Sequence, residues 1–402
     1  MNAPTSPPDT NTCKVDWPAG LNSVPSSIFS REDVYQLELD KIFYGPLWHP
    51  VAHESEITEP GAFKTFQIGE IPLIINRDMD GQFHTFLNVC THRGTLVETK
   101  NSGTRRNFNC PYHGWAWNSS GDLTACPNSE DFPDSFKKEH YGLKQLRCES
   151  FQGLLFATFS DETPPLNEWL SGVAGPLTYA LGDGEPLQFL GYQKTTYASN
   201  WKTYRDNDGY HVAQLHAAFR LLNWQGGKGE QIVDEQGNMS VVAELNVAAA
   251  GGFLKDPSVV EFRGSDPSRG ANIIVTNPVT LTTRHMDMFN IRFVIPRGVD
   301  KTEVHWAYYA KQSDDAEMVR HRVMQSSNVL GPSGLVSLED AAAFSRIQST
   351  AKVDGISRFM KGIGDENALS DHASQNDETA NMLWWNDYRD RMGFAHPEPR
   401  QF

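Results

Sequence analysis

Two short cysteine–histidine pairs are the residues of this chain best suited to binding a metal. Cys90 and His92 lie in the string Cys-Thr-His-Arg-Gly, and Cys110 and His113 lie in Cys-Pro-Tyr-His-Gly-Trp. The glycines and the proline suit loops whose backbone N–H groups point at sulfur. A Cys2His2 zinc site is one interpretation, although one residue between Cys90 and His92 is a shorter spacer than zinc knuckles use. The alternative is a [2Fe–2S] cluster with two thiolates on one iron and two imidazoles on the other.

A second candidate metal site follows later in the chain. Asp208, His211 and His216 form the pattern Asp-x-x-His-x-x-x-x-His, which begins a few residues after Asn-Trp-Lys. Two histidines at this spacing do not share one face of an ideal helix, because five residues advance by about 500°. They converge on one ion only where the helix is locally distorted. Taken alone, the spacing also fits two structural histidines.

Composition and charge limit the classes of function. The chain has 402 residues, of which 39% are hydrophobic and 21% charged, so a large folded core is expected. Its net charge of -15 argues against nucleic acid or an anionic membrane surface as the main partner. It shows no apolar run long enough to cross a membrane and no secretory signal pattern, so a cytoplasmic protein is expected. Five cysteines, an odd number, do not suggest a disulfide framework.

The elements that position these residues fall into two parts. Short runs rich in β-branched and aromatic residues, separated by turn residues, predict a small β domain that ends near Pro164 and Pro165. The remainder of the chain mixes the hydrophobic periodicity of helices with that of strands, so the fold class expected for the chain is α+β. Helices are predicted at about 28–43, 207–222, 315–328, 338–348 and 378–391, and strands of the second part at about 273–275, 291–295 and 303–309.

Taken together, the two motifs resemble those of the Rieske non-haem iron oxygenases that hydroxylate aromatic rings. The cysteine–histidine strings resemble the Rieske motif, and the Asp-x-x-His-x-x-x-x-His string looks like the catalytic half of this family. Respiratory Rieske proteins carry an extra cysteine in each loop, where this chain has Thr95 and Tyr112. The pattern, including the tail from Trp384 to Gly393, looks like the large subunits of systems acting on terephthalate, salicylate or anthranilate.

The resemblance implies the ligands of both metal centres. Cys90, His92, Cys110 and His113 would bind the Rieske cluster, and the mononuclear Fe(II) would be bound by His211, His216 and Asp340. Three protein ligands on one side leave the opposite side of the iron open for O₂ and substrate. Asp340 lies in Gly-Pro-Ser-Gly-Leu-Val-Ser-Leu-Glu-Asp, with Glu339 as the alternative ligand. Without the resemblance, an acidic residue at this position would be explained by its favourable interaction with the positive N-terminal end of a helix dipole.

Asp208 has a separate role in the resemblance. It would link His113 of one subunit to His211 of the next across a trimer interface, because a carboxylate between two imidazoles orients both. The chain departs from the family pattern in having two residues fewer before this position. Asp206 and Asn207 therefore stand where Glu-Asn is usual, and Asp206 is an alternative bridging group.

The substrate-facing residues are predicted less directly. Arg292 lies in a strand-like run and could bind a carboxylate or sulfonate with two parallel hydrogen bonds if it faces the interior. The alternative is an arginine on the solvent or subunit-interface side. Residues near the metal ligands in sequence are further pocket candidates: Asn207, Val212, Leu215, Phe219 and Phe344.

The resemblance also implies cofactors, partners and domains. The chain would be the large subunit of a terminal oxygenase, a homotrimer with or without a small β subunit. It contains no nicotinamide or flavin fingerprint, so a separate NAD(P)H-dependent reductase or ferredoxin would supply electrons. The substrate would be a small aromatic molecule; the alternatives are a monooxygenase that dealkylates an amine or ether, and a pure electron-transfer protein. Expected domains are an arm with a helix (1–45), a Rieske β-sandwich (46–163) and a catalytic domain with a curved antiparallel sheet covered by helices (164–402).

Overall fold

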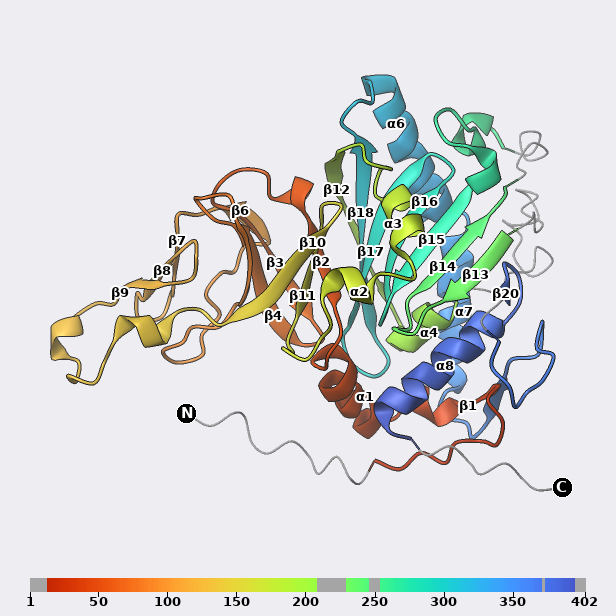
Figure 1. Cartoon of the computed structure of the whole chain (residues 1–402), viewed down its shortest axis with the longest axis horizontal. Helices are drawn as coiled ribbons and strands as arrows, with labels where there is room; N and C mark the ends of the chain where they lie inside the picture. Colours follow the sequence, from red (N-terminus) through yellow and green to blue (C-terminus); the bar gives the residue numbers. More distant parts are fainter. Residues whose placement is uncertain (1–12, 208–228, 246–253, 371–372, 395–402) are drawn as a thin grey trace. The chain divides into compact units, whose positions relative to one another are not determined.

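The computed structural model describes residues 13–207, 229–245, 254–370 and 373–394. Contacts divide the chain into two compact units (Figure 1). The smaller unit spans residues 44–166. The larger unit combines the N-terminal segment up to residue 43 with residues from 167 onward. In the described residues, no helix is long and apolar enough to cross a membrane.

The smaller unit is an all-β structure with two antiparallel sheets. The larger sheet has the strand order β2-β11-β10-β5-β4-β3-β6 and the smaller sheet has the order β7-β8-β9. Their strands are β2 (His49–His53), β3 (Ala62–Ile68), β4 (Ile71–Arg77), β5 (Phe83–Leu87), β6 (Ser102–Thr104), β7 (Asn107–Asn109), β8 (Ala116–Asn118), β9 (Leu123–Ala125), β10 (Gln145–Phe151) and β11 (Leu154–Thr158). The expected small β domain is thus confirmed, with glycines at positive φ in two of its turns, Gly81 and Gly121.

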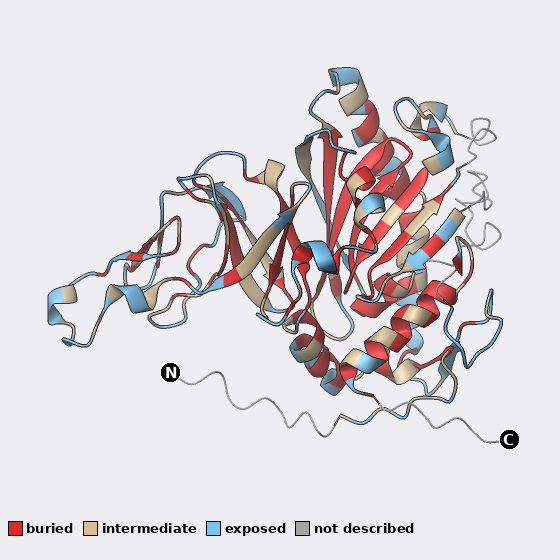
Figure 2. Cartoon of the chain, viewed as in Figure 1, coloured by how far each residue is buried: buried red, intermediate tan, exposed pale blue. Residues whose placement is uncertain are grey.

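The larger unit is built around an eight-stranded antiparallel sheet. Its order, β12-β18-β17-β16-β15-β14-β13-β20, shows that neighbours in the sheet are mostly neighbours in sequence. The strands are β12 (Leu187–Tyr197), β13 (Gly229–Val233), β14 (Met239–Ala243), β15 (Ala271–Thr276), β16 (Thr280–His285), β17 (Met288–Pro296), β18 (Thr302–Lys311) and β20 (Ala373–Ser374). Every residue of β16 and β17 is buried, so both faces of the sheet are covered here (Figure 2).

Helices cover the two faces of this sheet. Arg284 of β16 donates a hydrogen bond to the Tyr179 carbonyl of α3 (Ala174–Ala180), so α3 lies on one face. Tyr197 of β12 packs against Tyr204 of α4 (Trp201–Asp206) and Phe344 of α7 (Ser337–Thr350), and these two helices lie on the other face. We call the face covered by α4 and α7 the inner face.

The remaining helices begin and end where the sequence signals indicate. Asp315 caps α6 (Ala316–Gln325) by accepting from the Met318 backbone N–H, and α8 (Thr379–Met392) ends at Gly393 in the left-handed region. The helices predicted at 315–328, 338–348 and 378–391 are confirmed. The N-terminal prediction is met by α1 (Glu32–Glu38) and the π turn that follows it. The helix predicted at 207–222 lies outside the described residues except for its first position.

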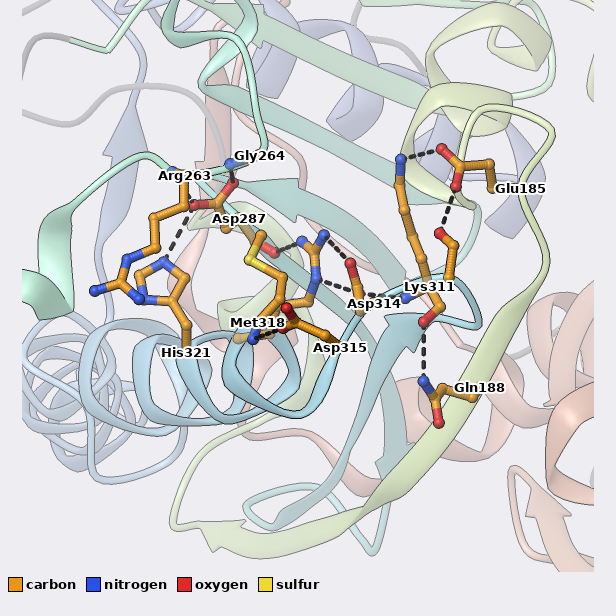
Figure 3. A network of polar contacts seen from close by, with 12 residues as sticks. Glu185, Gln188, Arg263, Gly264, Asp287, Lys311, Asp314, Asp315, Met318 and His321 are labelled. Atoms are coloured by element: carbon orange, nitrogen blue, oxygen red, sulfur yellow. Dashed lines mark hydrogen bonds and ion pairs between the residues drawn. The ribbon is translucent and has the colours of Figure 1, made fainter.

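The turn between β16 and β17 is tied to α6 by a buried polar network (Figure 3). The Asp287 carboxylate accepts from the backbone N–H groups of Arg263 and Gly264, at 2.6 and 2.9 Å, and from His321 at 3.1 Å. Arg322 of α6 binds the Asp314 carboxylate with two hydrogen bonds, of 2.7 and 3.0 Å. Charges this deeply buried require such partners, and this network supplies them locally.

The N-terminal segment is more ordered than the sequence predicted. The polar, proline-rich sequence of residues 1–25 predicts a loosely structured arm, but β1 (Ser23–Pro25) pairs with β19 (Ile356–Arg358). The expectation was wrong for these residues because their strand partner is remote in sequence, and a local pattern cannot reveal it.

Candidate functional site

The two cysteine–histidine strings of the smaller unit fold into matched loops. The Cys90 N–H donates to the Thr95 carbonyl at 2.8 Å, and the Cys110 N–H donates to the Trp115 carbonyl at 2.7 Å. In each loop a glycine N–H returns to the cysteine carbonyl, from Gly94 at 2.9 Å and from Gly114 at 3.1 Å, and both glycines have a φ of 72°. A positive φ is readily adopted only by glycine, which explains why each string has a glycine where its loop closes.

The two cysteines are buried close to one another. Burial raises the pKa of the Cys90 thiol, while hydrogen bonds from the backbone N–H groups of His92 and Arg93 to its sulfur lower the pKa again. The neighbouring Cys110 side chain, which also hydrogen-bonds with Cys90, raises the pKa. The sulfur thus lies in a loop that stabilises a thiolate through backbone N–H groups, as expected from the sequence.

The two histidines complete a set of four metal-binding side chains. The rings of His92 and His113 lie 4.8 Å apart, centroid to centroid, and Trp115 stacks parallel on His92 at 4.6 Å. The Nδ1 atoms of both histidines are buried and have no hydrogen-bond partner. A buried ring nitrogen without a partner is costly in a folded protein, and metal coordination relieves that cost. These four side chains therefore fit a Rieske [2Fe–2S] cluster.

The donors are arranged in pairs rather than around a single point. In the part of the chain that the structure describes, no group of three or more His, Cys, Asp or Glu residues is placed to hold one metal ion. An arrangement in pairs is compatible with a two-iron cluster, in which each iron takes only two protein ligands.

The second motif is described only at its beginning, on α4. Most of the predicted residues of this motif lie outside the described residues: Asp208, His211, Val212, Leu215, His216 and Phe219. Asn200 caps α4 by accepting from the Lys202 N–H at 3.0 Å. Asn207 directly follows the helix and is half-buried.

Asp206 at the end of α4 is held by the C-terminal helix α8. Its carboxylate accepts from Trp385 Nε1 at 2.7 Å and from the Asn381 amide at 3.2 Å. Although part of the side chain reaches solvent, the surrounding protein raises the pKa of Asp206 to about 7, chiefly by burial. These contacts give Asp206 a role in packing α4 on α8 and favour Asp208 as the bridging group.

The carboxylate predicted as the third iron ligand, Asp340, lies in the first turn of α7. The Gly-Pro-Ser-Gly turn before α7 requires glycine, because a Cβ at Gly334 would lie 2.4 Å from the Val329 carbonyl oxygen. Phe344, one turn further along α7, packs at 5.8 Å from Tyr197 of the inner face. Burial raises the pKa of Tyr197, with a further contribution from the Asp340 charge. Asp340 and Phe344 are thus both brought to the inner face.

Arg292 also lies on the inner face and is only 8% exposed. It opposes Trp306 across β17 and β18, and its guanidinium stacks over the Trp306 ring at 4.4 Å. Its Nε donates to the Asn290 Oδ1 at 3.3 Å. Arg292 is therefore an interior residue in this structure and not a solvent-facing one.

Sequence reasoning missed three further residues of this face. Asn290 lies two residues before Arg292 on the same strand, so strand alternation around Arg292 could have found it. Thr283 and Trp306 come from the neighbouring strands and are identified only by the register. No local signal distinguishes them from other strand residues.

Comparison with known families covers both units. Residues 47–145 match the Rieske [2Fe-2S] domain, and residues 185–380 match the catalytic domain of the ring hydroxylating alpha subunit. The chain is 30% identical to the alpha 2 subunit of a Comamonas terephthalate 1,2-dioxygenase terminal oxygenase component, over 94% of this chain and 98% of that protein. It is also 30% identical to the anthranilate 1,2-dioxygenase large subunit of Burkholderia cepacia, over 81% of this chain and 83% of that protein.

Solved structures show the same fold. A Rhodococcus naphthalene 1,2-dioxygenase bound to indole aligns with a TM-score of 0.81 and 23% identity, over 92% of this chain and 94% of that chain. A quaternary ammonium Rieske monooxygenase aligns with a TM-score of 0.74 and 21% identity, over 95% of this chain and 97% of that chain. Motifs, fold and relatives agree, and the chain belongs to the Rieske non-haem iron oxygenases as a ring-hydroxylating large (alpha) subunit, an oxidoreductase that uses O₂.

Proposed function

We propose that this protein is the terminal oxygenase component of a system that hydroxylates an aromatic acid. The observation that carries the proposal is the pair of matched cysteine loops with two unpartnered histidine Nδ1 atoms, in a chain whose second part matches the ring-hydroxylating catalytic domain. Cys90, His92, Cys110 and His113 are the proposed cluster ligands. The proposed ligands of the mononuclear iron are His211, His216 and Asp340.

The residues of the chain have separate tasks around these groups. When bound, the cluster would supply electrons one at a time and the mononuclear iron would activate O₂. Cys90 and Cys110 would hold the cluster through their sulfur atoms, and Trp115 holds the His92 ring in position by stacking. Asp340 would supply the carboxylate ligand of the mononuclear iron. Phe344 would supply apolar surface beside it. Asp208 would orient an imidazole of each centre.

The acidic character of the substrate is supported by Arg292. A guanidinium is always charged at physiological pH and binds a carboxylate with two parallel hydrogen bonds. Relatives named for terephthalate, anthranilate and salicylate fit this substrate class. We propose that Arg292 faces the substrate, with Asn207, Val212, Leu215, Phe219 and Phe344 as further substrate-facing residues.

The assembly is proposed to follow the Asp208 bridge. A carboxylate that links His113 of one subunit to His211 of the next requires a homotrimer, with or without a β subunit. We propose a cytoplasmic location and electron supply by a separate reductase or ferredoxin. We also propose three domains: the arm (1–45), the Rieske domain (46–163) and the catalytic domain (164–402), with the arm belonging to the catalytic domain. The compact unit of residues 44–166 supports these boundaries.

The test is oxygen consumption with benzoate-like acids and their neutral counterparts, with a Rieske reductase supplied. We expect O₂ uptake and a hydroxylated product with acids. His211→Ala should retain the visible absorbance of the cluster and lose product formation. If the variant and the wild type transfer electrons equally well and neither forms product, the chain is an electron-transfer protein. Formaldehyde release from methoxy-substituted acids would instead identify the dealkylating alternative.

A further inference from the structure

We infer that four residues of the inner face bind the carboxylate of the substrate as one unit, the donor set: Thr283, Asn290, Arg292 and Trp306. The inference rests on the proposed function and deepens it, because it names the residues that would select the acid. It requires that these residues come together in space, that Thr283, Asn290 and Trp306 have hydrogen-bonding atoms without a partner, and that the surroundings favour an anion.

Strand register brings the donor set together. Thr283 of β16 is the direct partner of Asn290 of β17, and Arg292 of β17 is the direct partner of Trp306 of β18. Directly opposed residues of antiparallel strands share one face with Cβ atoms about 5 Å apart. Asn290 and Arg292 are two residues apart and also share that face. The four side chains therefore form a compact group across three strands.

Three members of the donor set have unused hydrogen-bonding atoms. The Thr283 hydroxyl, the Asn290 Nδ2 and the Trp306 Nε1 are buried and have no partner, in side chains that are at most 1% exposed. The Arg292 bond to Asn290 Oδ1 fixes the amide so that its NH₂ group is the atom left without a partner. Leaving a buried donor unpaired is costly in a folded protein, so three adjacent unpaired donors call for a missing acceptor.

The surroundings of the donor set favour an acceptor that carries negative charge. Burial, with Arg292 nearby, lowers the pKa of His285 to about 3, so this histidine of the inner face is neutral. Arg292 is the cation that strand β17 itself places on this face, and α4 adds Arg205 beside Met239. On the inner face of β16, β17 and β18, the described residues include no aspartate or glutamate, and the acid that reaches this face, Asp340, comes from α7. Indole N–H, amide NH₂, hydroxyl and guanidinium all donate, which matches the acceptor-only character of a carboxylate.

The neighbouring strands give the substrate a direction. The inner-face residues of β14 and β15 next to the donor set are aliphatic: Met239, Val241, Ile273 and Val275. A bound molecule would thus meet donors at one end and hydrocarbon beside them, while the buried guanidinium of Arg205 lies beyond, its Nη1 4.0 Å from the Met239 sulfur. This arrangement fits an aromatic ring with its acid group at the donor set.

The test compares two adjacent threonines. Thr282 and Thr283 are both buried and both have an unpartnered hydroxyl, but strand alternation places them on opposite faces of the sheet. Binding of benzoate to the anaerobic holoenzyme is measured by calorimetry. We expect Thr283→Val to weaken benzoate binding about tenfold and Asn290→Leu at least as much, as for lost hydrogen bonds to a charged group. Thr282→Val should bind benzoate within about twofold of the wild type.

The binding results distinguish a failure of the donor set from a failure of the proposed function. Benzamide, the neutral isostere, should bind the wild type weakly and respond little to Thr283→Val. The donor set is overturned if Thr283→Val and Thr282→Val bind benzoate equally well while the wild type still hydroxylates acids, and the proposed function then stands. If neither benzoate nor 4-methylbenzoate binds the wild type, the acid class falls together with the donor set.

Discussion

At the scale of single residues, the chain separates cysteines that serve the cluster from cysteines that fill space. Cys90 and Cys110 lie in matched loops with backbone N–H groups around them, whereas Cys126 is buried in the same hydrophobic core without such a loop. Burial alone therefore does not identify a ligand. The loop geometry does, because it supplies the hydrogen bonds that stabilise a thiolate.

Cys110→Ser should abolish the cluster, and Cys126→Ser should not. A serine hydroxyl is a poor substitute for a thiolate ligand, so we expect Cys110→Ser to lose the visible absorbance and the acid-labile sulfide of the purified protein. Cys126→Ser changes a buried thiol of equal size and controls for the effect of substitution in this core. Retention of full cluster content by Cys110→Ser would contradict the ligand assignment.

A second residue-scale prediction concerns Asp206 and pH. Its pKa is raised to about 7 in the folded protein from the ordinary value of 3.8, so between these values the folded state binds a proton that the unfolded state lacks. The free energy of unfolding should therefore fall as pH rises through this range. Since part of the side chain reaches solvent, we expect a fall of about 2 kcal/mol rather than the full value that such a shift implies.

The measurement for Asp206 is denaturant unfolding of the wild type and of Asp206→Asn at about pH 5 and pH 7.5. An asparagine retains an oxygen that can accept from Trp385 and Asn381 but does not titrate. The variant should match the wild type at the lower pH and be more stable at the higher one. An equal difference between the two proteins at both pH values would show that Asp206 does not titrate in this range.

At the scale of elements, α4 is fixed on two sides before it reaches the metal-binding motif. Glu38 of α1 accepts from Lys202 Nζ and Trp201 Nε1 of α4 and from the Tyr388 hydroxyl of α8, and the Glu38–Lys202 pair is fully buried. Asp206 provides the second attachment, to α8. Because α4 leads directly into Asp208, these contacts determine where the motif begins.

Lys202→Met should destabilise the protein by about 3–5 kcal/mol, because it leaves the Glu38 carboxylate buried without a counter-charge. Adding Glu38→Gln should recover part of the loss, since a neutral amide can accept from Trp201 through its oxygen and donate to the Tyr388 hydroxyl through its NH₂ group. Thermal unfolding of the single and double variants measures this coupling. Lys194→Met, at an exposed position of β12, serves as the control and should change stability little. Simple additivity of the two single changes would contradict the coupling.

At the scale of the whole molecule, the proposed trimer predicts complementation between inactive subunits. Cys110→Ser lacks the cluster and His211→Ala lacks an iron ligand, so neither homotrimer should form product. If electrons pass between neighbouring subunits, a mixed trimer isolated with two different tags should regain a measurable fraction of wild-type activity. No activity in the isolated mixed trimer would place both centres of one electron path in the same subunit. Mixing after purification without subunit exchange is the negative control.

The sequence by itself determined the chemistry of the smaller unit and the long elements. Ligand strings are local, because each loop of Cys90 and of Cys110 is closed by hydrogen bonds within a few residues. Helices such as α7 and α8 have local periodicity and local end signals. The resemblance to a family rested on these same local features.

Only the tertiary structure decided which side chains share a face. Thr283, Asn290 and Trp306 meet because of strand register, and shifting one strand by a single residue would turn its members to the opposite face. Likewise the pairing of β1 with β19 and the contacts of Glu38 join residues that are far apart in sequence. Register and long-range packing depend on the whole core at once, so a local pattern predicts an arginine in a strand but not the residues that lie beside it.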